Sequence, residues 1–171
     1  MIQNFTFLPR LAVRLSAFVP ECAVADAAFM TQLTCMLAEA GIDTVLNDTG
    51  CVIHAPYCEV ISGDDVLATV LPVSGEMQVG RQLILSAGML TDARALHDHL
   101  QGFASANVPV WFEVARTEDL PVLAASMQVQ QILFSAGLAQ ACLKEGVVKA
   151  VRDMCASVAK IRAESLQRRG L

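Results

Sequence analysis

The stretch VPVWFEVARTEDLPVLAASMQVQQILFSAG, residues 108–137, decides the fold that we expect for this chain. It holds two apolar runs, 108–115 and 131–134, which are typical of strands buried on both faces. Between them, Thr117 is followed by two acidic residues, which predicts the start of a helix because carboxylates favour its positive end. A strand, a helix and a second strand in this order predict a right-handed unit with parallel strands.

The same alternation extends to both sides of this stretch. Upstream, an apolar strand is predicted at 83–85, followed by a helix that Thr91 caps. Downstream, Leu138 begins a long helical stretch in which Gly146 predicts a break. We therefore expect parallel strands throughout the part from Leu83 to Phe134.

The first seventy residues follow a different pattern. A strand is predicted at 11–19, and a helix is predicted between a cap at Asp26 and a stop at Gly41. Short strands separated by tight turns are then expected at 44–46, 51–55, 59–61 and 66–70. Such a meander predicts antiparallel pairing. The predicted fold class is α/β in a single domain, 1–171: a mixed sheet with a parallel βαβαβα C-terminal part, an antiparallel-leaning N-terminal part and a long C-terminal helix.

Residues 108–137 also resemble a strand–helix unit of the barrel enzymes that bind flavin or sugar phosphates. The resemblance rests on PVWFEV (109–114), TED (117–119) and ILFSAG (132–137). A complete barrel of this type has about 250 residues, whereas this chain has 171. We therefore carry no function over from the resemblance.

Composition limits the classes of partner. Apolar residues make up 54% of the chain and charged residues 17%, so little charge is available to cover the surface. We therefore expect another chain, a second copy or a different protein, to cover part of it. The net charge is −9 over residues 1–137 and +4 over 138–171, and this acidic body argues against a nucleic acid partner. No apolar run is long enough to predict a membrane span.

The six cysteines indicate a cytoplasmic protein with reduced thiols, because they lie within predicted strands and helices rather than between short elements. Cys51, His54 and Cys58 have residue types that suit zinc. On a strand, however, Cys51 and His54 would face opposite sides. We therefore expect no metal site and no cofactor.

Two Ser-Ala-Gly turns, 86–88 and 135–137, each follow a predicted strand. Ligands of α/β sheets bind beyond the carboxyl ends of the strands, and helix N-termini attract anions. The sequence therefore predicts a site for a small anion, a phosphate or carboxylate, at Ser86, Gly88, Ser135 and Gly137. The alternative is that small residues serve only the tight turns and their packing.

Glu113 is the candidate catalytic residue. It lies near the carboxyl end of an apolar strand, where burial would raise its pKa and suit it to act as a general base. The alternative is a structural salt bridge to Arg116 or Arg81.

The last helix has an apolar seam with alternating spacings of four and three residues, as in a coiled coil. A candidate interface with another chain therefore comprises Val147, Val151, Met154, Val158 and Ile161. A helix packed on its own sheet needs the same apolar stripe, so both interpretations stay open.

Two functions follow from these patterns. The first is a non-catalytic cytosolic subunit that oligomerises or joins a complex through apolar surface and its last helix. The alternative is a small enzyme or ligand-binding protein with an anion site at the carboxyl ends of its parallel strands.

Overall fold

A computed structural model of the chain describes residues 8–19, 26–69, 82–86, 94, 96–98, 100–101 and 110–170. Within these residues, seven strands form one sheet in which every pairing is parallel. The strands are β1 Arg10–Arg14, β2 Thr44–Asn47, β3 Glu59–Ser62, β4 Val66–Thr69, β5 Gln82–Ser86, β6 Val110–Val114 and β7 Gln131–Phe134. The α-helices are α1 Leu15–Phe18, α2 Ala27–Ala40, α4 Leu120–Ala125, α5 Ala136–Glu145 and α6 Val147–Arg168, with 3-10 turns η2 Gly63–Asp65 and η4 Thr117–Asp119.

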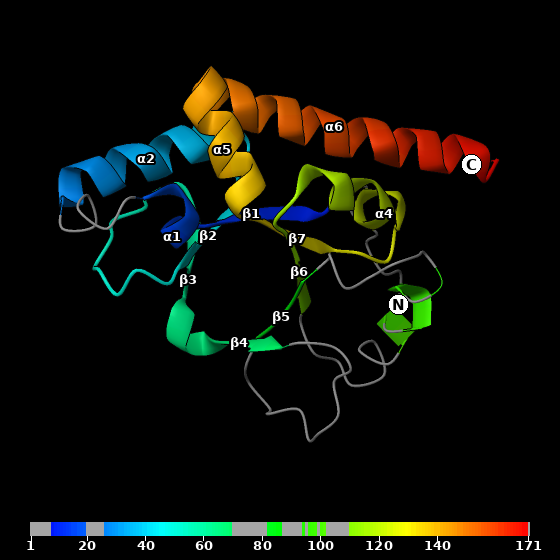
Figure 1. The fold of residues 1–171 in the computed structure, drawn as a ribbon, viewed down its shortest axis with the longest axis horizontal. Helices are drawn as coiled ribbons and strands as arrows, with labels where there is room; N and C mark the ends of the chain where they lie inside the picture. Colours follow the sequence, from blue (N-terminus) through cyan, green and yellow to red (C-terminus); the bar gives the residue numbers. More distant parts are fainter. Residues whose placement is uncertain are drawn as a thin grey trace.

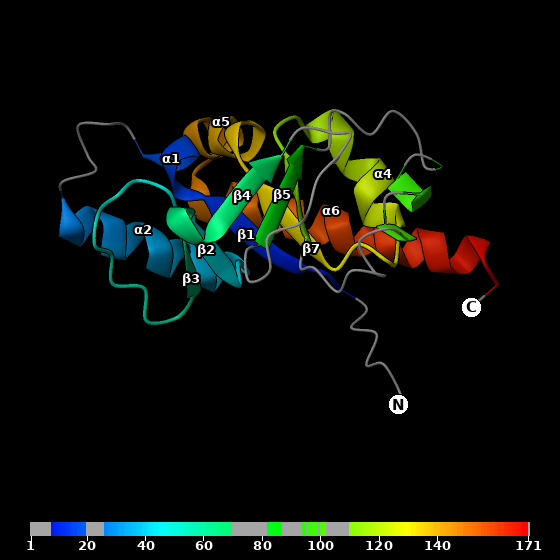
Figure 2. The ribbon, with the colours of Figure 1, turned by 90° about the horizontal axis from the view of Figure 1, so that it is seen from below.

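The strand order is that of a parallel barrel. It runs β3-β2-β1-β7-β6-β5-β4, so the first strand lies beside the last and the others follow the chain round a ring. The two edge strands, β3 and β4, are separated only by the three residues of η2. One continuous segment, 59–69, therefore supplies both edges of the sheet. Figure 1 shows the resulting curl, with α2, α4, α5 and α6 on its outside, and Figure 2 shows it from below.

Side chains alternate between the two faces of the curled sheet and form two cores. The outward side chains, such as Val13, Leu85 and Phe112, pack with the helices in the larger core. The inward core takes one residue from each strand: Ala12, Leu46, Ile61, Val66, Ile84, Trp111 and Leu133. The void left among these seven side chains is ≈ 10 Å³, barely enough for one water molecule. The interior of the curl is therefore a packed layer.

The register of the sheet is staggered. Ala12 pairs with Thr44 along the backbone, although its inward neighbour in the core is Leu46. Likewise Leu133 pairs with Glu113, two residues beyond Trp111. A tilt of this kind is what closing a sheet on itself requires.

The predicted antiparallel N-terminal part is wrong, because β2, β3 and β4 all run parallel to their neighbours. The short strands and turns look like hairpins in the sequence. However, residues 48–58 form no strand, including the one expected at 51–55, and return the chain to the start of the sheet. The strand expected over 11–19 ends at Arg14, where α1 begins.

Three of the predicted helix boundaries agree with the structure. The carboxylate of Asp26 accepts from the amides of Ala28 and Phe29 and begins α2. Gly41 ends the helix with φ +117°, in the region that favours glycine. Gly146, with φ +86°, separates α5 from α6 as expected. In contrast, the side chain of Thr117 caps neither η4 nor α4, α5 begins at Ala136 rather than Leu138, and Thr91 lies outside the described residues. None of the helices in the described part of the chain is long and apolar enough to span a bilayer.

Candidate functional site

The carboxyl ends of the strands carry polar side chains above the inward apolar layer. In each strand, the residue two positions beyond the inward core residue faces the same interior. In β1 and β6 these residues are Arg14 and Glu113, and the corresponding positions just after β2 and β7 are Asp48 and Ser135. We call these four residues the mouth of the curled sheet.

Charged groups from three strands meet at the mouth. Arg14 reaches across β7 and donates from Nε to Oε1 of Glu113 and from Nη2 to Oε2, each at 2.9 Å. Its Nη1 donates to Oδ2 of Asp48, also at 2.9 Å. The three side chains are about one fifth exposed, at 21%, 19% and 20% for Arg14, Glu113 and Asp48. They are therefore reachable from solvent although they belong to the interior.

Ser16 fixes the Asp48 carboxylate from the other side. The Ser16 amide donates to Oδ1 at 3.0 Å and the hydroxyl to Oδ2 at 2.7 Å. Burial alone would raise the pKa of Asp48, but the hydrogen bonds from Ser16 and Arg14 outweigh it, so the pKa lies below its ordinary value of 3.8. Asp48 is thus a charged acceptor at neutral pH.

Glu113 has a partner that the sequence analysis did not name. Of the two predicted partners, Arg116 instead pairs with Asp119 at 3.0 Å on the surface, and Arg81 lies outside the described residues. Arg14 and Asp48 meet the criterion that selected Glu113, since each is a charged residue at the end of an apolar strand. Only the closure of the sheet, which places β1 beside β7, brings the three together.

Of the two predicted anion-site serines, Ser135 is buried in the mouth and Ser86 is exposed at its edge. Ser135 is 4% exposed, and its hydroxyl has no hydrogen-bond partner within the described part of the chain. Its amide donates to the Val114 carbonyl at 3.3 Å. Ser86 is the exposed last residue of β5. It lies two positions beyond the inward residue Ile84 and pairs in register with Glu113. Gly88 lies outside the described residues.

Gly137 is needed for the close approach of α5 to β6. Its amide donates to the Ala115 carbonyl at 2.8 Å. A Cβ at this position would lie 2.8 Å from the same oxygen, closer than real Cβ contacts. Packing therefore accounts for this glycine.

A polar cleft of ≈ 440 Å³ adjoins the mouth at the ends of β2 and β3. Asp48 lines it and connects it to Arg14, and Asp64 lies on its other wall. No cationic side chain is among its described lining residues: Asn47, Asp48, Gly50, Cys51, Val52, Ser62, Gly63 and Asp64.

The opposite end of the interior is closed by polar contacts. Arg10 forms an ion pair with Glu59, donates to the Thr44 hydroxyl at 3.0 Å and lies 5.8 Å from the Trp111 ring centre. The Trp111 indole N–H donates to Gln82. These five side chains pair with one another, whereas the buried Oε1 of Gln131, the register partner of Arg10, has no hydrogen-bond partner among the described residues.

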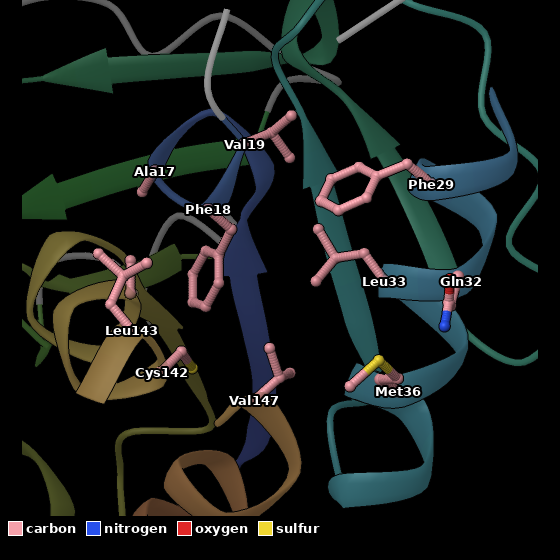
Figure 3. Close-up of a pocket in the computed structure, with 11 residues that line it drawn as sticks. Ala17, Phe18, Val19, Phe29, Gln32, Leu33, Met36, Cys142, Leu143 and Val147 are labelled. Carbon is pink, nitrogen blue, oxygen red and sulfur yellow. The ribbon is translucent and has the colours of Figure 1, made fainter. Parts of the chain in front are cut away.

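A second, apolar groove of ≈ 630 Å³ lies on the outer face of the curled sheet, between α1, α2 and α5 (Figure 3). Phe29, Leu33 and Met36 of α2 face it from one side, and Cys142 and Leu143 of α5 from the other. Its described lining residues are Ala17, Phe18, Val19, Phe29, Gln32, Leu33, Met36, Ala139, Cys142, Leu143 and Val147.

The apolar seam of α6 packs within its own chain. Val151 and Val158 are fully buried and Met154 is 9% exposed. Val147 and Ile161 are partly buried against the same core, and α6 contacts α2, α4 and α5.

The cysteines of the described residues are thiols without disulfides. Cys58 donates to the carbonyls of Thr34 and Ile42 at 3.7 and 3.6 Å. Burial raises its pKa to about 11, with a contribution from Asp43. No group of three metal-ligating side chains occurs among the residues searched, which include Cys51, His54 and Cys58.

No family model matches this chain, and no curated protein matches it either.

Proposed function

We propose that this chain binds a small polar ligand at the mouth of its curled sheet. The observation that carries the proposal is the convergence of Arg14, Asp48 and Glu113 from three strands at the carboxyl end of the sheet. Proteins with parallel barrels and open α/β sheets bind their ligands at this end, an analogy at the level of the fold.

The charges of the mouth favour binding over proton transfer by Glu113. Both oxygens of the Glu113 carboxylate accept hydrogen bonds from Arg14, so the guanidinium holds this side chain in place rather than leaving it free to meet a substrate proton. Arg14 has five N–H donors and uses three of them on Glu113 and Asp48. Two donors of Arg14 and the hydroxyl of Ser135 are then available to a ligand that enters the mouth.

The test is a binding screen with a variant that keeps the shape of the site. Wild-type protein with labelled amide nitrogens is titrated by NMR with phosphate, small carboxylates, polyols and amines. A mouth ligand should shift the resonances of residues 14, 48, 113 and 135 together. Glu113→Gln should change its affinity at least tenfold. Binding of an amine should weaken because a charged acceptor is lost, and binding of a phosphate or carboxylate should strengthen because Arg14 is then less neutralised.

The control is Arg116→Gln, which breaks an exposed ion pair on the same side of the sheet and should leave binding unchanged. Urea unfolding of both variants separates lost binding from lost folding. The proposal fails if no class of compound shifts the mouth resonances, or if Glu113→Gln binds with the same affinity as the wild type.

Assembly with another chain is a second candidate function, and a different surface favours it. The connection from β2 to β3 contains no helix, and apolar side chains near β3 are left exposed: Val52 at 95%, Tyr57 at 76% and Val60 at 42%. If this surface joins copies of the chain, Tyr57→Ser with Val60→Lys should lower the mass in light scattering. An unchanged mass would count against self-association there.

A further inference from the structure

We infer that the groove between α1, α2 and α5 is a second binding site, for an uncharged apolar molecule with a single hydrogen-bonding end. This site is separate from the mouth, because it lies on the outer face of the sheet among helices. The inference therefore does not depend on the proposed function.

The walls of the groove are two facing helix stripes. Phe29, Leu33 and Met36 lie at spacings of four and three residues on one face of α2. On α5, Cys142 and Leu143 follow Ala139 by three and four residues, so these three also share a face. Figure 3 shows Phe29 and Leu33 directed from α2 toward the space between the helices, with Phe18 of α1 between α2 and α5. The chain leaves large apolar side chains in contact with water here, since Phe29 is 40% and Leu143 88% exposed.

The polarity of the lining sets the chemical class of the ligand. No charged residue is among the described lining residues, and the only polar side chain among them is Gln32. A charged ligand would lose its hydration without gaining a partner. A carboxamide both donates and accepts, so Gln32 can hold one hydroxyl or amine group of a ligand that is otherwise apolar.

The size of the groove favours a small molecule over a protein. Its ≈ 630 Å³ lies within the range of about 300–1,000 Å³ that is typical of small-molecule sites. At about 30 Å³ for each water molecule, a ligand would release about twenty waters from apolar walls. A stable protein interface involves about twenty to thirty residues on each side, whereas eleven described residues line this groove.

The test uses N-phenyl-1-naphthylamine, an uncharged apolar fluorophore with one N–H. Its emission should rise when it binds the wild-type protein, and 1-decanol should displace it more strongly than decanoate does. Leu143→Glu places a carboxylate on the wall and should weaken binding at least tenfold. This side chain is 88% exposed, so the change should leave folding intact.

Gln140→Glu is the matched control, because residue 140 is exposed on the same helix outside the lining. It adds the same charge and should bind the fluorophore as the wild type does. Gln32→Leu should weaken binding about threefold to tenfold, because the hydrogen bond to the amine is lost.

Three results would overturn the inference. The first is no emission change with the wild type, and the second is equal binding by Leu143→Glu. The third is a wild-type dimer in light scattering that Leu143→Glu dissociates, since a second copy would then cover the groove.

Discussion

Arg14 is the residue on which the charged interior depends. It donates hydrogen bonds to Glu113 and to Asp48. The Asp48 carboxylate also accepts a hydrogen bond from the Ser16 amide. Removing Arg14 would leave the carboxylates of Asp48 and Glu113 close together and partly buried. The free energy lost in this way exceeds what the intact ion pairs contribute to stability. The network therefore stabilises the arrangement of β1, the end of β2 and β6 around β7.

Asp48 should make the stability of the protein depend on pH. Because its pKa is lowered in the folded state, its interactions stabilise the protein above the ordinary value of 3.8 and are lost as the pH falls through the folded value. We expect Asp48→Asn to lower the free energy of unfolding by about 1–2 kcal/mol at pH 7. The difference from the wild type should shrink as the pH falls below 3.8 and through the lowered pKa of the folded state.

Urea unfolding of both proteins across this pH range checks the prediction. A difference that persists unchanged at low pH would show that the charge of Asp48 contributes nothing to stability.

Cys58 should be chemically inert while the protein is folded. Its pKa of about 11 compares with an ordinary value of 9.0, so its thiolate is about a hundredfold scarcer at pH 8 than in the unfolded chain. Alkylation with iodoacetamide, followed by peptide mass spectrometry, should therefore be slow at Cys58 in buffer and about a hundredfold faster in urea. Equal rates in both conditions would contradict this burial.

At the residue scale, the sequence identifies individual charged residues of the site better than the ion pairs that they form. Glu113 stands out in an apolar strand, and its place at the carboxyl end is read from the pattern alone. Its partner Arg14 is ninety-nine residues away in the chain. Nothing in the local pattern tells which distant strand will become the neighbour of β7.

At the element scale, the contact of α5 with β6 is the tightest that a glycine makes among the described residues. We expect Gly137→Ala to lower the free energy of unfolding by about 1–3 kcal/mol, because the new methyl group would overlap the Ala115 carbonyl. Gly50→Ala is the comparison: Gly50 has φ +75° but open space around it. Gly50→Ala should cost only about 1 kcal/mol of backbone strain. Chemical unfolding measures both, and equal stability of Gly137→Ala and the wild type would rule out this overlap.

The sequence also predicts the positions of helices and strands better than the directions in which the strands run. The caps at Asp26 and Gly41 and the break at Gly146 depend on local chemistry, and all three are observed. The direction of β3 depends on the path of residues 48–58, which bring the chain back to the start of the sheet. A sequence pattern of short strands between turn residues does not indicate that path. The seam of α6 is likewise visible in the sequence, but a stripe has the same spacing whether it packs on its own chain or on another.

At the scale of the whole molecule, the two cores share one sheet and should unfold together. Trp111 is the only tryptophan of the chain and lies in the inward core, whereas the helices pack their apolar faces in the outward core. We therefore expect the red shift of tryptophan emission and the loss of helical circular dichroism to coincide in urea. A fluorescence transition at lower urea would show that the curl opens before the helices melt.

The joining of both sheet edges in segment 59–69 bears on solubility. An exposed strand edge is a template on which other chains can add, and it is a common start of aggregation. Here each edge strand is four residues long, and η2 interrupts the backbone between them. The curled sheet therefore offers incoming chains only short, bent stretches of unpaired amides, although the protein is rich in apolar residues.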